Sequence, residues 1–263
     1  MTRARPASPA GDAPGGPVVI RTGQGEAHVL IDRPGIEPGS TAGGAPRPRF
    51  LLALTHGSGG GVETADLLAV RDAALALGGA VARIVQPYLV RGARSPGSVA
   101  RQDAAWISVL AAVREMAGTD VRGERAGHGP AGRGGADRIP LVQGGRSNGA
   151  RVACRTAGQT GAGAVIALAF PLHPPGRPER SRRDELRTAT AAGADVLVVN
   201  GSRDPFGVPG QADAGGPAGA EGTAGSARIV VLDGEGHQLS RDPAALHAVV
   251  SSWLRGWVHD HGA

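Results

Sequence analysis

The stretch PLVQGGRSNGARVACRTA, residues 140–157, decides the fold that this sequence predicts. It begins as an apolar strand, turns through GGRSNG and continues as a helix rich in alanine and arginine. Gly145 to Gly149 matches G-x-S-x-G, a pattern in which a serine stands on a sharp turn between strand and helix. Side chains at the two glycines would crowd that turn. Ser147 is therefore the candidate nucleophile, and an ordinary tight turn is the alternative interpretation.

Strands and helices alternate on both sides of this turn. The predicted strands are 17–21, 27–31, 50–55, 80–85, 139–142, 164–170, 195–200 and 228–232, and the predicted helices are 63–77, 98–116, 148–157 and 243–258. The first two strands suggest a hairpin around 22–25. Most of the later strands are unbroken apolar runs separated by helices, which is typical of a parallel sheet covered on both faces. The predicted class is a three-layer α/β fold with a mostly parallel central sheet.

Glycine and proline, 44 and 20 of the 263 residues, gather in segments without helical or strand patterning. Residues 1–17 are predicted to be a disordered tail, and 33–49 a loop. Residues 118–138 and 207–226 are predicted to be flexible insertions, which cost little because loop-closure entropy grows slowly with length. Residues 18–260 are thus predicted to form a single domain.

All 28 basic residues are arginines, because the chain contains no lysine. This excludes the phosphate-binding loop that ends in Gly-Lys, Schiff-base chemistry and Ser-Lys dyads. The arginines are dispersed and aromatic residues make up only 3% of the chain, so we predict no nucleic-acid partner. No metal-ligand spacing and no nucleotide loop stand out, so we also predict no metal and no cofactor. The oligomeric state is left open.

The compartment is predicted from three features. The start, MTRARPASPAGDAPGG, lacks the apolar region of a signal peptide. The longest uninterrupted apolar run, 164–170, is far shorter than the roughly 20 residues needed to span a membrane. The one cysteine, Cys154, has no partner for an internal disulfide. We therefore expect a soluble, cytoplasmic protein without a membrane partner.

Two further residues complete a catalytic set with Ser147. Asp204, in NGSRDPF, directly follows one predicted strand, and His237, in DGEGH, follows the last one. Taken separately, they suggest an Asp-Pro turn and an exposed loop histidine. Together they give the order Ser…Asp…His, with each residue after a separate strand. The competing acids are Asp195, Asp213 and Asp233, of which Asp233 is the most serious.

HGSGGG, residues 56–61, directly follows another predicted strand. A dinucleotide loop is disfavoured, because the frame starting at Gly57 places Val62 where a third glycine is needed. The next strand also ends without the acidic residue that would hold a ribose. An oxyanion hole fits better, with one backbone N–H from Ser58 and one from Asn148.

Four other features carry weaker signals. Cys154 is predicted to pack in the core, and His173 either borders the site or forms a structural turn. His259 to His261 could bind a metal but fits a solvated tail better. The charged run 177–187 is predicted to be a solvated entry to a helix.

HGSGGG, GGRSNGAR, FPLHPPGRPE, NGSRDPF and GEGH, in this order, resemble the small dienelactone-hydrolase-like α/β-hydrolases of the KANL/Tex type. The resemblance spans residues 50–257. It implies Ser147 as nucleophile, Asp204 as acid and His237 as base. The chain departs from the family at 118–138 and 207–226, and in the second of these relatives usually carry a helix.

The sequence thus predicts a serine hydrolase that cleaves a carboxylic ester or related acyl bond of a small molecule through an acyl-enzyme. The segment between Phe170 and Asp195 is too short for a large lid domain. The alternative is a non-catalytic binding or scaffold protein built on the same fold.

Overall fold

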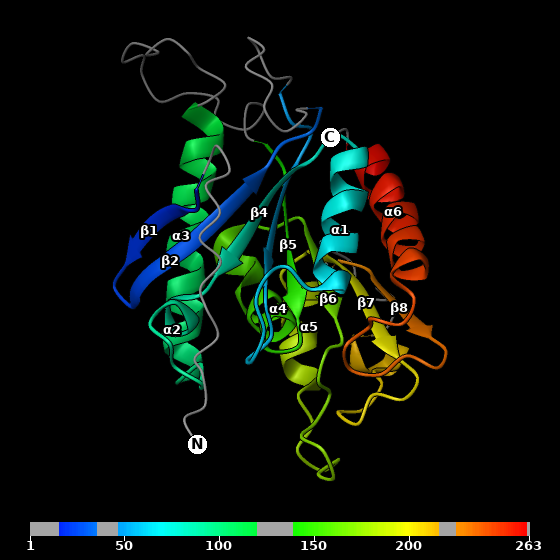
Figure 1. Ribbon diagram of the computed structural model, residues 1–263. Coiled ribbons are helices and arrows are strands. Elements are labelled where there is room, and N and C mark those ends of the chain that lie inside the picture. Colours follow the sequence, from blue (N-terminus) through cyan, green and yellow to red (C-terminus); the bar gives the residue numbers. More distant parts are fainter. Residues whose placement is uncertain (1–15, 36–46, 120–138, 216–224, 262–263) are drawn as a thin grey trace, which may run out of the picture.

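A computed structural model describes residues 16–35, 47–119, 139–215 and 225–261. One eight-stranded sheet runs through it in the order β1-β2-β4-β3-β5-β6-β7-β8 (Figure 1). The strands are β1 Val18–Thr22, β2 Gly25–Asp32, β3 Leu51–Thr55, β4 Ala80–Val85, β5 Leu141–Arg146, β6 Ala164–Leu168, β7 Asp195–Gly201 and β8 Ala227–Leu232. β1 pairs with β2 and β2 with β4 in antiparallel fashion, and the strands from β4 to β8 are parallel.

Helices cover both faces of the sheet, which makes three layers (Figure 1). Successive strand side chains point to opposite faces. In β3, Leu52 and Leu54 therefore join the core beneath α1 and α6, while Leu51 and Ala53 join the core beneath α3. α4 and α5 pack over β6 and β7. The helices are α1 Ala65–Ala76, α2 Pro87–Val90, α3 Val99–Thr119, α4 Asn148–Thr160, α5 Arg183–Ala191 and α6 Pro243–Asp260, with a 3₁₀ turn at Gln211–Asp213.

The predicted fold class is confirmed, including the opening hairpin. The prediction was wrong in detail at β5, which was expected at 139–142 but extends to Arg146. Two glycines weakened the strand signal there, yet β3 and β6 hydrogen-bond on both sides and hold the segment extended. α2 was not predicted, and α5 occupies part of the charged run that was expected to be only a helix entry.

The predicted tail and the insertion at 118–138 lie almost entirely outside the described residues, whereas the insertion at 207–226 is described at 207–215 and 225–226. Within their described parts, α3 continues to Thr119 and the 3₁₀ turn follows Gly210. Between β6 and β7 the chain holds only a loop and α5, so no large lid domain is present there. In the part of the chain that the structure describes, no helix is both long and apolar enough to span a membrane.

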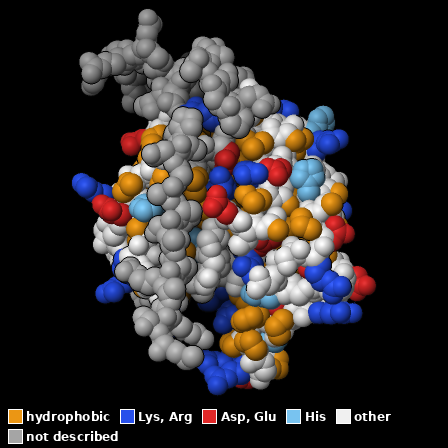
Figure 2. Space-filling view, in the orientation of Figure 1, with side chains coloured by type: hydrophobic (Ala, Val, Ile, Leu, Met, Phe, Trp, Pro, Cys, Tyr) orange, Lys and Arg blue, Asp and Glu red, His pale blue; other side chains and the backbone are white. Residues whose placement is uncertain are grey.

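Four of the parallel strands end at the same edge of the sheet, where reactive residues of open α/β folds gather. β3 leads into the loop at 56–61, β5 into Ser147, β7 into Asp204 and β8 into His237. Arginines and acidic side chains are interspersed over the face in Figure 2 rather than segregated. The sequence candidates therefore meet at one end of the sheet.

Candidate active site

Ser147 stands on a strained turn between β5 and α4. Its φ of 53° and ψ of −112° lie in a region that non-glycine residues rarely adopt. The glycines on either side make the turn possible: a Cβ on Gly145 would come within 2.6 Å of the Thr55 carbonyl oxygen, and one on Gly149 within 2.7 Å of that of His56. These neighbours are backbone atoms that cannot step aside. The turn places the serine at the N-terminus of α4, where the helix dipole favours negative charge.

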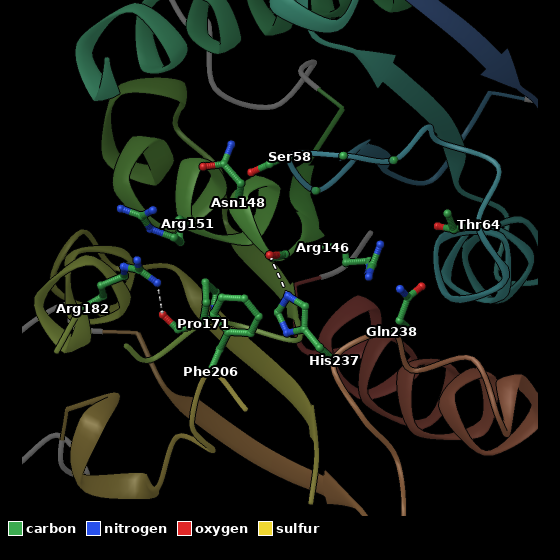
Figure 3. Close-up of a pocket in the computed structure, with 14 residues that line it drawn as sticks. Ser58, Thr64, Arg146, Asn148, Arg151, Pro171, Arg182, Phe206, His237 and Gln238 are labelled. Carbon is green, nitrogen blue, oxygen red and sulfur yellow. Dashed lines mark hydrogen bonds between the residues drawn. The ribbon is translucent and has the colours of Figure 1, made fainter. Parts of the chain in front are cut away.

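Ser147, His237 and Asp204 form a continuous hydrogen-bonded chain. His237 Nε2 lies 2.9 Å from Ser147 Oγ, and His237 Nδ1 lies 2.8 Å from Asp204 Oδ2 (Figure 3). A carboxylate only accepts hydrogen bonds, so Nδ1 donates to it and Nε2 is free to accept the serine proton. The Asp204 side chain is fully buried, and that of His237 is 17% exposed.

The competing acids lie elsewhere. Asp233 accepts a hydrogen bond from Ser202 Oγ at 3.1 Å, and Asp195 accepts from the backbone and hydroxyl of Ser226. Asp213 accepts from the backbone N–H of Gly210. The structure thus brings Asp204 alone of these four carboxylates into contact with His237.

Several neighbours hold the Asp204–His237 pair in place. Asp204 Oδ1 accepts from the Phe206 backbone N–H at 2.9 Å, and the Phe206 ring stacks on the imidazole at a centroid distance of 4.2 Å. The amide of Asn200 donates to Asp204 Oδ2 at 3.3 Å. The same amide bonds both the N–H and the carbonyl of Phe170, so it ties the acid to the end of the neighbouring strand.

Hydrogen bonds of Glu235 hold the loop that carries His237. The buried side chain of Glu235 accepts from the backbone N–H groups of Arg241 and Asp242 at 2.8 and 2.7 Å. The Glu235 carbonyl accepts from the N–H of Arg203, next to the catalytic acid candidate. These bonds link the two loops that hold the imidazole and the carboxylate.

Ser58 and Asn148, the predicted oxyanion donors, line the same pocket as Ser147, and their side chains lie near each other in Figure 3. Two side-chain donors hold the carbonyl of Gly57: His56 Nδ1 at 2.7 Å and Tyr88 Oη at 3.3 Å. That carbonyl and the Ser58 N–H belong to one trans peptide plane and point in opposite directions. The hydrogen bonds that hold the Gly57 carbonyl therefore also fix the direction of the Ser58 N–H.

His56 is locked in one tautomer. Its Nε2 accepts from the backbone N–H of Gln86 at 3.0 Å, so its proton is on Nδ1, which faces the Gly57 carbonyl. Burial lowers the pKa of His56 from its ordinary value, although the bond to Gly57 opposes this. The imidazole is thus kept neutral, as an acceptor at Nε2 requires.

Ser147 and His237 open into a pocket of about 450 Å³. Its glycine-rich rim is the loop after β3, and Pro171 and Phe206 supply apolar surface. Three arginines complete the wall: Arg146, Arg151 and Arg182. The pocket therefore combines the candidate nucleophile with positively charged side chains.

The weaker sequence candidates lie away from this chemistry. Cys154 is fully buried, as predicted, and burial raises the pKa of its thiol well above the ordinary value. His173 bonds the Pro174 carbonyl through Nδ1 and the Phe206 carbonyl through its backbone N–H, and its side chain does not line the pocket. His261 stacks on Trp257, and no cluster of three metal-ligating side chains occurs within the described ranges.

Sequence reasoning did not find Asn200, Phe206 or Glu235, and it did not single out His56. Each acts through contacts with residues distant in the chain or through its own backbone. The only available signal was position: Asn200 ends β7, Phe206 and Glu235 flank the two predicted site residues, and His56 opens the glycine-rich loop.

In a comparison with protein-family models, residues 48–242 match the alpha/beta hydrolase domain. The match covers most of the chain, so the protein belongs to the α/β-hydrolase family. The matched range includes Ser147, Asp204 and His237. A search of curated proteins found no match.

Solved structures share the fold. An alpha-beta serine hydrolase homologue from Coxiella burnetii aligns with a TM-score of 0.65 at 16% identity, covering 90% of this chain and 96% of that one. A lidless α/β serine hydrolase from Xanthomonas campestris aligns at 0.62 and 18%, covering 96% and 98%. Dienelactone hydrolase from Anabaena variabilis aligns at 0.56 and 19%, covering 91% and 96%. The fold is therefore that of dienelactone-hydrolase-like α/β-hydrolases.

Proposed function

We propose that the protein is a serine hydrolase that cleaves a carboxylic ester or a related acyl bond of a small molecule through an acyl-enzyme. The observation that carries the proposal is the hydrogen-bonded chain from Ser147 through His237 to Asp204, at 2.9 and 2.8 Å. An isolated G-x-S-x-G turn would not need a histidine at the serine oxygen, nor a buried carboxylate behind that histidine. Family membership and the shared fold support the same class.

In the first half-reaction, Ser147 Oγ attacks the acyl carbon while His237 Nε2 takes the hydroxyl proton. The carbonyl oxygen becomes an oxyanion that accepts hydrogen bonds from the N–H groups of Ser58 and Asn148. As the tetrahedral intermediate collapses, the bond to the alcohol oxygen breaks and His237 gives that oxygen its proton. The acyl group is left esterified to Ser147.

In the second half-reaction, His237 takes a proton from water, which attacks the acyl-enzyme carbon. Collapse of this intermediate breaks the bond to Ser147 Oγ and returns the proton to it, releasing the acid. Asp204 stays ionised throughout, holding Nδ1–H and stabilising the imidazolium. No step needs a metal or a cofactor, because these side chains supply every proton transfer.

Hydrolysis of short p-nitrophenyl esters tests the proposal. The wild type should release a burst of p-nitrophenol close to one equivalent if acylation outruns deacylation, and it should turn over in either case. Ser147→Ala should lose about 10⁶-fold in kcat, the loss typical of a removed nucleophile. Ser202→Ala, at an exposed serine that bonds Asp233, is the control and should retain activity. If p-nitrophenyl esters, thioesters and lactones all remain intact, the alternative of a non-catalytic binding protein replaces the proposal.

A further inference from the structure

The charged side chains that line the pocket are all positive. Three of the 14 lining residues are arginines and none is acidic. Figure 3 shows Arg151 and Arg182 together on one side of the pocket, across Phe206 from His237, while Arg146 lies on the other side. A negative group on an ester would therefore meet positive but no negative side chains along this wall.

Two of the arginines, Arg146 and Arg151, form ion pairs with carboxylates. Arg146 faces the buried Asp66, with Nε and Oδ2 at 3.2 Å. Arg151 forms two hydrogen bonds to Glu185, at 2.7 and 2.6 Å. Glu185 also accepts from Arg155 at 2.9 Å, and Arg155 forms two further hydrogen bonds to Asp103, at 3.0 and 2.6 Å. Two arginines and two carboxylates thus balance one another in this cluster.

Arg182 is different. Among the described residues it has no carboxylate within ion-pair distance, and its side chain donates one hydrogen bond, from Nη1 to the Pro171 carbonyl at 3.0 Å. Burial lowers the pKa of Arg182, and the neighbouring positive charge of Arg151 lowers it further, although Glu185 opposes this. A guanidinium nevertheless stays protonated in proteins. It carries five N–H donors, so the others remain available to an anion.

The side of the pocket that holds these arginines decides which part of an ester carries the negative group. His237 must protonate the departing alcohol oxygen, so the alcohol lies on the His237 side. Arg151 and Arg182 lie beyond Phe206 on the opposite side (Figure 3), where the acyl chain is left to extend. Arg182, which has no carboxylate partner among the described residues, can then bind an anionic group at the far end of that chain, with Arg151 beside it.

Building on the proposed function, we propose that the preferred substrates are esters of acyl chains that end in a carboxylate, bound by Arg182 with Arg151 beside it. Guanidinium groups match carboxylates in shape, and a charge-assisted pair is stronger than a neutral hydrogen bond. Arg182 binds rather than reacts, so its removal changes the choice of substrate and not the chemical step.

The test compares p-nitrophenyl esters of adipic acid, which keeps one free carboxylate, and of hexanoic acid, which has the same number of carbons. The wild type should prefer the adipate ester by at least about tenfold in kcat/KM, as a hydrogen bond to a charged group allows. Arg182→Gln should abolish the preference. Arg182→Glu should reverse it in favour of the 6-aminohexanoate ester. Arg180 is an exposed arginine on the same loop outside the pocket, so Arg180→Gln is the matched control and should keep the preference.

Binding measurements separate a failure of this inference from a failure of the proposed function. Ser147→Ala should bind monoethyl adipate more tightly than ethyl hexanoate in calorimetric titration, and the double variant with Arg182→Gln should not. That result would stand even if no ester were hydrolysed. Equal kcat/KM values for the two esters, a preference that survives Arg182→Gln, or a preference only for a carboxylate on the alcohol side would overturn the inference.

Discussion

The exchange Asp204→Asn tests the arrangement of the site at its most sensitive point. The two oxygens of Asp204 accept from three donors: His237 Nδ1, the Phe206 N–H and the Asn200 amide. An asparagine side chain has one oxygen for these positions and must turn its NH₂ group toward one of them. If the NH₂ faces His237, Nδ1 must accept, the proton moves to Nε2 and the imidazole can no longer take the serine proton. If the NH₂ group faces Phe206 instead, it points at the Phe206 N–H, and two hydrogen-bond donors then face each other.

The same exchange in serine proteases lowers kcat by about 10⁴-fold, because the imidazole is held in the wrong tautomer. That factor corresponds to about 5.5 kcal/mol in the activation free energy. We expect a loss of this order here, with little change in the melting temperature because the two side chains have nearly the same shape. The assay is steady-state hydrolysis of a p-nitrophenyl ester beside a thermal melt.

Asp233→Asn is the matched control. Asp233 is four residues from His237 in sequence, but it bonds the exposed hydroxyl of Ser202. Its exchange should leave kcat within a few-fold of the wild type. A near-normal rate for Asp204→Asn together with a collapse for Asp233→Asn would refute the assignment of the acid.

Three further predictions follow from the site. His56→Phe removes the shorter of the two side-chain hydrogen bonds to the Gly57 carbonyl, so kcat should fall by about 10- to 100-fold while KM changes little. An unchanged kcat would show that this peptide does not need the histidine to hold it. Gly149→Ala should lower the free energy of unfolding by at least about 1–3 kcal/mol in chemical denaturation, because the new Cβ would press on backbone oxygens. Gly256→Ala in α6, where a Cβ meets no neighbour, is the control and should be neutral or stabilising. Prolonged dialysis against EDTA should leave esterase activity intact; a loss reversed by added Zn²⁺ would require a metal-dependent step.

Much of the fold could be predicted from the sequence because local patterns and long-range packing agree. β4 was predicted with its exact bounds, since AVARIV is dominated by valine and isoleucine and ends at a proline-led helix. β5 was cut short, because Gly144 and Gly145 have low strand propensity and are held extended by their neighbours on both sides. A prediction from local strand propensity does not include these hydrogen bonds to the neighbouring strands.

The candidate site was predictable where a residue type stood at a fixed place relative to a strand. Ser147, Asp204 and His237 each follow a strand, and the structure brings them within hydrogen-bonding distance. The supporting contacts were not predictable in the same way. Asn200 reaches Phe170, and Arg151 reaches Glu185, across about 30 residues of chain, and only the folded sheet and helices bring these partners together.

The central claim, that Ser147 is an activated nucleophile, is tested most directly by labelling with a fluorophosphonate and locating the adduct by mass spectrometry. Such a probe reacts with activated serines and needs no assumption about the substrate. The account predicts a single adduct on Ser147, which is absent from Ser147→Ala and strongly reduced in His237→Ala. An adduct on Ser58 or Ser202, or labelling that persists in Ser147→Ala, would contradict it.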